Sequence, residues 1–219
     1  MTQPVLLSRA NGLWAVNKPS GWTAHPQGDP GIDDVLTWAR EVLSAPASIA
    51  PVHRLDRATS GVLLLSPDAS VRAAIGGELA EGRVHKHYRA LVYGRANKKG
   101  IVRRPIRDRR RGASVPAVTR FTRLAAFKSV SLLAVRPETG RRHQIRVHLS
   151  GIGHALVGDE RYPPRRRRSV PGFPGRLWLH ALRLELPDGT TFEAPLPEAL
   201  EHHLTLLGER ASTTRAAPQ

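Results

Sequence analysis

The hydrophobic positions in the first 80 residues predict short strands alternating with helices. Leu13–Val16 is an apolar run of strand length, and Gly61–Ser66 is a short run of leucine and β-branched residues typical of a buried strand. Apolar residues at helical spacing predict a helix over Ile32–Leu43. A second helix is expected from about Pro67 to Ala80, where a proline followed by an aspartate marks its start.

The second half of the chain is richer in strands. The predicted strands are His87–Val92, Val115–Leu124 and Val130–Val135, followed by a hairpin of Leu177–Leu186 with Thr191–Ala194. The predicted helices are Arg141–Leu149 and Pro197–Leu207. This order indicates an α+β fold with a mixed, mostly antiparallel sheet. No linker divides the sequence, so we expect one catalytic domain over residues 10–208 and a disordered tail over 209–219.

Charge narrows the choice of partner. The 219 residues contain 34 Lys and Arg against 18 Asp and Glu, a net charge of +16 that favours a polyanion such as RNA. A solvated basic surface would give the same total. The excess is concentrated in Lys98–Gly112, which has eight basic residues and one Asp, and in Arg165–Arg168 within a loop rich in Pro and Gly. Each is interpreted as a solvated mobile segment or as an arm that binds nucleic acid.

Missing residue types exclude several classes of protein. Without cysteine there is no disulfide framework, iron–sulfur cluster, zinc ribbon or thiol nucleophile. The ten histidines lack the carboxylate pattern of a metal site, and neither a G-x-G-x-x-G motif nor a P-loop occurs. We therefore expect no metal and no cofactor. No secretory signal and no apolar run of ~20 residues is found, so we expect a cytoplasmic protein and no membrane association.

The densest reactive cluster is the sequence HRLDRATSG at residues 53–61. It places one carboxylate, Asp56, among a histidine, two arginines and two hydroxyls, just before a predicted strand. Neighbouring positive charge favours the ionised form of a carboxylate, which can then act as a nucleophile, a base or an electrostatic stabiliser. A loop ion pair that fixes the strand is the alternative interpretation.

Two further clusters have both a functional and a structural interpretation. In TGRRHQIRVH at 139–148, His143 and Arg146 can share a helical face and hold a phosphate or orient a carboxylate, or the helix is simply basic and amphipathic. In NKPSGW at 17–22, Trp22 could stack on a base or pack in the core, and Tyr88 has the same two interpretations.

Taken together and in this order, these motifs resemble the RluA family of pseudouridine synthases. The resemblance rests on AVNKPSG at 15–21, HRLDRATSG at 53–61, and TGRRHQIRVH at 139–148 with GHALVGDERY at 153–162. KHYRALVYG at 86–94 and LHA at 179–181 agree with it more weakly. Ala155 and Arg142 depart from the residues common in the family, at positions that carry no chemistry.

The resemblance implies that Asp56 is the catalytic residue of an isomerase that converts uridine in RNA to pseudouridine. It implies that Arg146 pairs with Asp56, and that Tyr88 is also catalytic: it stacks on the uracil and can serve as the acid or base on carbon. A covalent attack by Asp56 and a glycal intermediate stay open as mechanisms. The residues implied in substrate binding are Arg54, Ile145, His53 and Lys18. The residues expected to hold the RNA backbone are Arg141, Arg142, His143, Arg109, Arg110 and Arg166.

The same resemblance leaves the RNA target open. Only residues 1–16 precede the Lys-Pro loop, so we expect no S4-type RNA-binding domain of the kind that many relatives have, and the chain resembles the short members of the RluA and TruC types. These act on rRNA and tRNA, and both targets stay open. We expect a monomer. The competing hypotheses are a non-catalytic RNA-binding or chaperone protein on the same fold and, more distantly, a metal-dependent nuclease.

Overall fold

The computed structural model describes the chain apart from residues 1, 27–30, 32, 109–111, 167–168 and 217–219. The chain forms two compact units. Unit 1 comprises Met1–His87, Glu138–Gly140 and His180–Pro195, and unit 2 comprises Tyr88–Pro137, Arg141–Leu179 and Leu196–Gln219.

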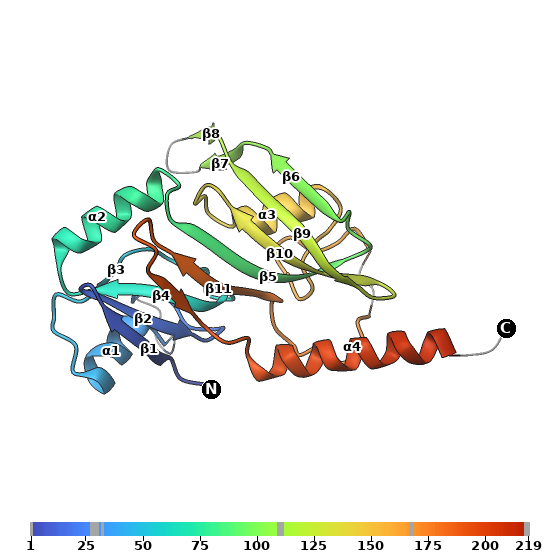
Figure 1. Ribbon diagram of the computed structural model, residues 1–219, viewed down its shortest axis with the longest axis horizontal. Coiled ribbons are helices and arrows are strands. Elements are labelled where there is room, and N and C mark those ends of the chain that lie inside the picture. Colours follow the sequence, from blue (N-terminus) through green and yellow to red (C-terminus); the bar gives the residue numbers. More distant parts are fainter. Residues whose placement is uncertain (1, 27–30, 32, 109–111, 167–168, 217–219) are drawn as a thin grey trace. The chain divides into compact units, whose positions relative to one another are not determined.

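Unit 1 is built on a mixed sheet (Figure 1). Its main strands, in spatial order, are β1 (Val5–Ala10), β2 (Leu13–Lys18), β4 (Ser60–Ser66) and β11 (Leu179–Glu185). Two shorter strands, β3 (Ala50–Pro51) and β12 (Thr191–Glu193), pair with β4 and β11. All these pairings are antiparallel except that of β4 with β11, which is parallel. Ser60 and Gly61, the first residues of β4 after the Asp56 loop, therefore lie directly beside His180 and Ala181 of β11.

Two capped helices complete unit 1, α1 (Val35–Leu43) and α2 (Ala69–Ala80). The Asp34 carboxylate accepts hydrogen bonds from the first free N–H groups of α1, and Asp68 does the same for α2. An aspartate at this position satisfies donors that the helix itself cannot. Partly buried apolar side chains of α2 pack on the cluster formed by the strands, which includes Leu13, Val62 and Leu184.

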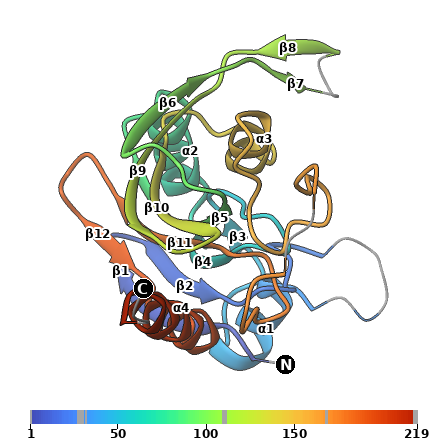
Figure 2. The ribbon, with the colours of Figure 1, turned by 90° about the vertical axis from the view of Figure 1, so that its right-hand side faces the viewer.

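Unit 2 has an antiparallel sheet in the order β5 (His85–Tyr93), β10 (Val130–Pro137), β9 (Val118–Ala126) and β6 (Lys99–Arg103). A separate hairpin, β7 (Ile106–Asp108) with β8 (Ala113–Val115), extends beyond this sheet (Figure 2). The helices are α3 (Gln144–Gly151) and α4 (Glu198–Ala216). Leu200 and Leu207 of α4 join a buried cluster with Trp178.

The α+β class and the mostly antiparallel sheet are confirmed, and most predicted elements are present within a few residues. The predicted strand Val115–Leu124 is wrong as one element, because it is divided at Pro116 and Ala117 between β8 and β9. A proline has no N–H to donate to a ladder, which explains the break. The basic segment Lys98–Gly112 contains β6 and β7.

Three further details differ from the prediction: one additional strand, the position of His143, and the end of helix α4. Strand β1 is missing from the prediction, because its sequence, VLLSRA, shows no alternation of apolar and polar residues, and none of its residues is fully buried. His143 is predicted inside a helix, yet it is the N-cap of α3 with a left-handed φ of 54°. Helix α4 does not end at Leu207 but continues to Ala216, through most of the tail predicted to be disordered.

Candidate active site

Asp56 lies in a loop, residues 53–60, that is anchored at both of its ends. Leu55 and Thr59 are buried on either side of Asp56, which is itself only half-buried. The N–H of Thr59 donates to the backbone oxygen of Asp56 at 3.0 Å and closes a turn. The loop therefore presents its single carboxylate from a fixed backbone.

Gly61 explains how closely the end of this loop approaches β11. Its φ is +118°, and a Cβ at this position would lie 2.1 Å from the backbone oxygen of Ala181. Only glycine has this conformation without strain, and only glycine leaves room for the neighbouring strand. The glycine of the TSG sequence therefore has a steric function at the β4–β11 pair.

Lys18 fixes the loop from the side of β2. Its side chain is fully buried, and Nζ donates to the backbone oxygens of Pro19 at 2.9 Å, Trp22 at 2.8 Å and Arg57 at 3.2 Å. Ser20 Oγ also donates to the oxygen of Ala58 at 2.8 Å. The predicted substrate contact of Lys18 does not fit this burial; the ammonium instead joins the Lys-Pro loop to the Asp56 loop.

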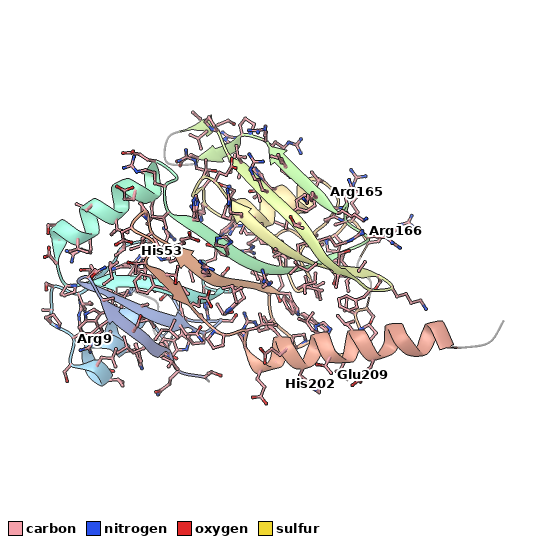
Figure 3. All side chains as sticks on the ribbon, in the orientation of Figure 1. Arg9, His53, Arg165, Arg166, His202 and Glu209 are labelled. Carbon is pink, nitrogen blue, oxygen red and sulfur yellow. The ribbon has the colours of Figure 1, made fainter. Side chains whose placement is uncertain are left out.

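His53 fixes the opposite end of the loop (Figure 3). The N–H of Leu64 donates to His53 Nε2 at 3.1 Å, so this nitrogen carries no proton. Burial, with a smaller contribution from the charge of Lys86, lowers the pKa of His53 to about 4. A neutral ring that accepts a backbone N–H of β4 is an anchor, which differs from the predicted substrate contact.

A buried hydroxyl–imidazole pair joins the two parallel strands. Ser60 Oγ lies 2.9 Å from His180 Nδ1, and His180 Nε2 lies 3.1 Å from the backbone oxygen of Ala194. Because that oxygen can only accept, Nε2 carries the proton and Nδ1 accepts from Ser60. The LHA sequence is thus a third support of the Asp56 loop, after Lys18 and His53, and the sequence pattern alone does not show this function.

Arg146 is held in unit 2 by a partner that the sequence analysis did not identify. Its Nε and Nη2 donate to the two carboxylate oxygens of Asp159, each at 2.8 Å, and both side chains are almost completely buried. Burial alone would raise the pKa of Asp159, but the bonds from Arg146 and from the N–H groups of Tyr162 and Arg161 hold it below its ordinary value. Both partners are therefore charged at neutral pH.

An aromatic ring completes the surroundings of this pair. The Arg146 guanidinium lies 5.3 Å from the centre of the Tyr162 ring, and the Tyr162 hydroxyl lies 3.0 Å from His143 Nδ1. His143 therefore contacts the aromatic ring beside Arg146, and its contact with the RNA backbone stays a prediction. The predicted pairing of Arg146 with Asp56 joins residues of different units and stays a prediction.

The other predicted residues fall into three groups. Tyr88 is half-buried on β5, and Ile145 is buried on α3. Exposed arginines at predicted RNA-contact positions are Arg54, Arg141, Arg142 and Arg166, the last of these on a loop (Figure 3). Arg109 and Arg110 lie outside the described residues.

Within the described ranges, no group of three His, Asp or Glu side chains could hold a metal ion. No helix in that part of the chain is both long enough and apolar enough to cross a membrane.

Comparison with known proteins assigns these clusters to a family. A family model described as RNA pseudouridylate synthase matches residues 12–151. An uncharacterized RNA pseudouridine synthase of Chloroflexus aurantiacus is 40% identical, over 90% of this chain and 67% of that protein. The ribosomal large subunit pseudouridine synthase D of Nitrosomonas europaea is 34% identical, over 88% of this chain and 62% of that protein. The chain thus spans about two thirds of the length of these relatives.

A solved structure agrees with this assignment. Human RNA Pseudouridylate Synthase Domain Containing 4 is similar to this chain with a TM-score of 0.78 and 26% sequence identity. The match covers 93% of this chain and 92% of that chain. The similarity therefore extends over both units.

Proposed function

Because this chain belongs to the RNA pseudouridylate synthase family, we propose that it isomerises uridine in RNA to pseudouridine with Asp56 as its catalytic residue. One observation supports the assignment of Asp56 most directly. Lys18, His53 and Ser60 fix the surrounding loop from three sides, while Asp56 between them is only half-buried. A loop ion pair with no catalytic function would need no such support around a carboxylate that substrate can reach.

The reaction conserves every atom of the uridine. The bond from ribose C1′ to uracil N1 breaks, the base turns, and C1′ bonds to C5; the proton on C5 is removed and N1 gains one. Asp56 would either attack the nucleoside or remove the proton on C2′ to give a glycal. Neither route requires a thiol or an electron carrier.

We assign Arg146 to hold Asp56 ionised and correctly oriented. Asp159 takes the Nε and Nη2 edge of the guanidinium, which fixes the plane of the group. A guanidinium has more N–H donors than one carboxylate can accept, so it can serve a second carboxylate. Tyr88 would stack on the target uracil, with Ile145 as the apolar wall beside it.

The proposed substrate is large-subunit rRNA, because the named relative from Nitrosomonas acts on the ribosomal large subunit according to its name. A tRNA is the second candidate, favoured by the similarity of KPSGW at 18–22 to the TruC type. The uridine must leave its stack to reach a carboxylate, at a cost of a few kcal/mol. Arg141, Arg142 and Arg166 would offset this cost by binding phosphates. Arg54 would help to displace the base from the stack or fill its place.

The test uses the purified chain with unmodified 23S rRNA transcript and, separately, an unmodified tRNA pool, without added cofactor. Site-level mapping of pseudouridine should show conversion at one or a few positions of the 23S transcript. Conversion of the tRNA alone would reassign the target. Tight binding to both RNAs without pseudouridine in either would favour the non-catalytic RNA-binding protein.

A further inference from the structure

The basic hairpin β7–β8 is bonded to helix α3 through both of its legs. On the incoming leg, the backbone oxygen of Arg104 lies 2.9 Å from His148 Nε2. On the outgoing leg, Arg141 Nε donates to the oxygen of Pro116 at 3.1 Å, and Gln144 Nε2 donates at 2.9 Å to the oxygen of Val118, the first residue of β9, where this leg enters the main sheet. All three donors belong to the segment that carries Arg146.

In the hydrogen bonds that join His148 to the Arg104 oxygen and to Thr119, each donor and acceptor has one consistent assignment. His148 Nε2 faces a carbonyl oxygen, so it carries the proton and Nδ1 must accept. Thr119 Oγ1, 2.9 Å from Nδ1, donates to it and in turn accepts from Gln144 Nε2 at 3.0 Å. His148, Thr119 and Gln144 are each at most 4% exposed. Burial lowers the pKa of His148, which keeps the ring neutral as the assignment requires.

The hairpin also has a covered inner side and a charged outer side. Ile106 and Val115 are paired across the hairpin and are buried. Arg107, next along β7, is exposed, as are Arg103 and Arg104 on the incoming leg. A hairpin with a buried inner face and bonds to a helix on both legs is a fixed element, unlike the mobile arm that its composition alone suggests.

We propose that His148 and Gln144 are positioning residues that hold the basic β7–β8 hairpin in register with helix α3, so that RNA bound by the hairpin is aligned with Arg146. This deepens the proposed function, since it takes RNA as the partner. The exposed arginines of the hairpin and those at the start of α3, Arg141 and Arg142, then act as one phosphate-binding surface. His148 affects RNA only through the hairpin.

Two amide substitutions each keep one of the two hydrogen bonds of His148 and remove the other. In His148→Gln, the amide nitrogen takes the place of Nε2 and can still donate to the Arg104 oxygen. In His148→Asn, the amide oxygen takes the place of Nδ1 and can accept from Thr119, but the bond to Arg104 is lost. The variants differ in which hydrogen bond they keep and also by one methylene group, so their melting temperatures are measured beside their affinities to separate loss of the hairpin bond from loss of packing.

The experiment measures binding of each variant to unmodified 23S rRNA transcript as a function of salt. A double variant of the incoming leg and the hairpin, Arg103→Ala at the end of β6 with Arg107→Ala in β7, is called the hairpin variant. It should bind about tenfold more weakly and with a shallower salt dependence, because two phosphate contacts are lost. We expect His148→Asn to approach this weaker affinity and His148→Gln to stay within about twofold of wild type. Adding His148→Asn to the hairpin variant should cause little further loss of RNA affinity, because the two changes act on the same contacts.

Equal affinity of the Asn and Gln variants, or a full additional loss in the hairpin background, would overturn the proposal. If neither His148 variant folds, amide hydrogen exchange of the wild-type protein replaces them. Residues 104–108 and 112–116 should then be protected like β9, and exchange within seconds would show a loose arm. Binding does not require turnover, so a wild-type protein that binds but makes no pseudouridine would refute the proposed function and leave this test intact.

Discussion

The loop that carries Asp56 and the helix that carries Arg146 hold their charged groups in different ways. The Asp56 loop is fixed by hydrogen bonds that do not involve the Asp56 side chain. Lys18 and Ser20 donate to backbone oxygens of the loop, and His53 accepts from the backbone N–H of Leu64. Arg146 is fixed by its own guanidinium, which Asp159 binds through two hydrogen bonds. A carboxylate that reacts must change its bonds during turnover, whereas an arginine stays charged. The Asp56 carboxylate is therefore best positioned through its backbone, and the Arg146 guanidinium through bonds to the side chain itself.

The largest effect is expected from Gly61→Ala, which places a methyl group against the backbone of β11. No side-chain rotation relieves this contact, so β4 and β11 must separate, and we expect no detectable conversion of uridine. Gly21→Ala is the matched control: its φ is also positive, at +95°, but nothing lies within 4 Å of the new Cβ. The control should lose only about 1 kcal/mol of stability in a denaturant titration. An active Gly61→Ala variant would show that the close approach of the strands is not required.

Asp159→Asn tests the other side of the comparison. It leaves the buried Arg146 guanidinium with a neutral partner, which typically costs about 3 to 5 kcal/mol of stability. We expect conversion of uridine to fall even at a temperature where the variant is still folded, because the Arg146 guanidinium loses its orientation. Glu193→Gln, which removes an exposed ion pair with Arg183, should change stability by less than about 1 kcal/mol. Equal effects of the two substitutions would contradict the assigned function of Asp159.

Lys18→Met removes the ammonium that joins two loops and keeps most of the apolar side chain. Three backbone oxygens lose a buried donor, and each net loss is worth about 1 kcal/mol, so the variant should be about 3 kcal/mol less stable. Conversion and stability should decline together, and RNA affinity should change little. Lys128→Met, at an exposed position outside the basic segments, serves as the control. A selective loss of RNA affinity in Lys18→Met would restore the predicted substrate contact.

The smallest effect is a dependence of stability on pH from His53. Its pKa in the folded protein is about 4, below the ordinary value of 6.5, so the unfolded chain binds more protons between these values. Stability should therefore be constant above pH 6.5 and fall as the pH is lowered towards 4, by an amount on the order of 2 kcal/mol. In His53→Gln the amide oxygen can still accept from Leu64, and this pH dependence should be absent. The measurement is denaturant unfolding at several pH values for both proteins.

The sequence was sufficient for elements whose signals are local. Helix α1 follows from apolar spacing, α2 follows from the proline and aspartate at its start, and the α+β class follows from the order of the elements. The motif at 53–61 also located the Asp56 loop. Directions of side chains were not predictable: Lys18 and His53 belong to the right motifs, yet they turn towards backbone atoms instead of solvent. No local pattern shows that a lysine will find three carbonyl oxygens.

Partners distant in the sequence were missed for the same reason. Asp159 stands in a recognisable motif, but its bidentate bond to Arg146 depends on how α3 packs. The connection from His148 through Arg104 joins segments that are 44 residues apart. Polar bonds of this kind can be found only once the register of β9 and the position of α3 are known.

The central claim is that the Asp56 carboxylate performs the reaction and that its neighbours only position it. The direct measurement is single-turnover conversion of RNA by Asp56→Asn, together with RNA affinity and melting temperature on the same preparation. Asp33→Asn, an exposed acid of unit 1, is the control. We expect conversion by Asp56→Asn to be undetectable while its affinity and melting temperature match those of the control. Conversion at the wild-type rate would contradict the account.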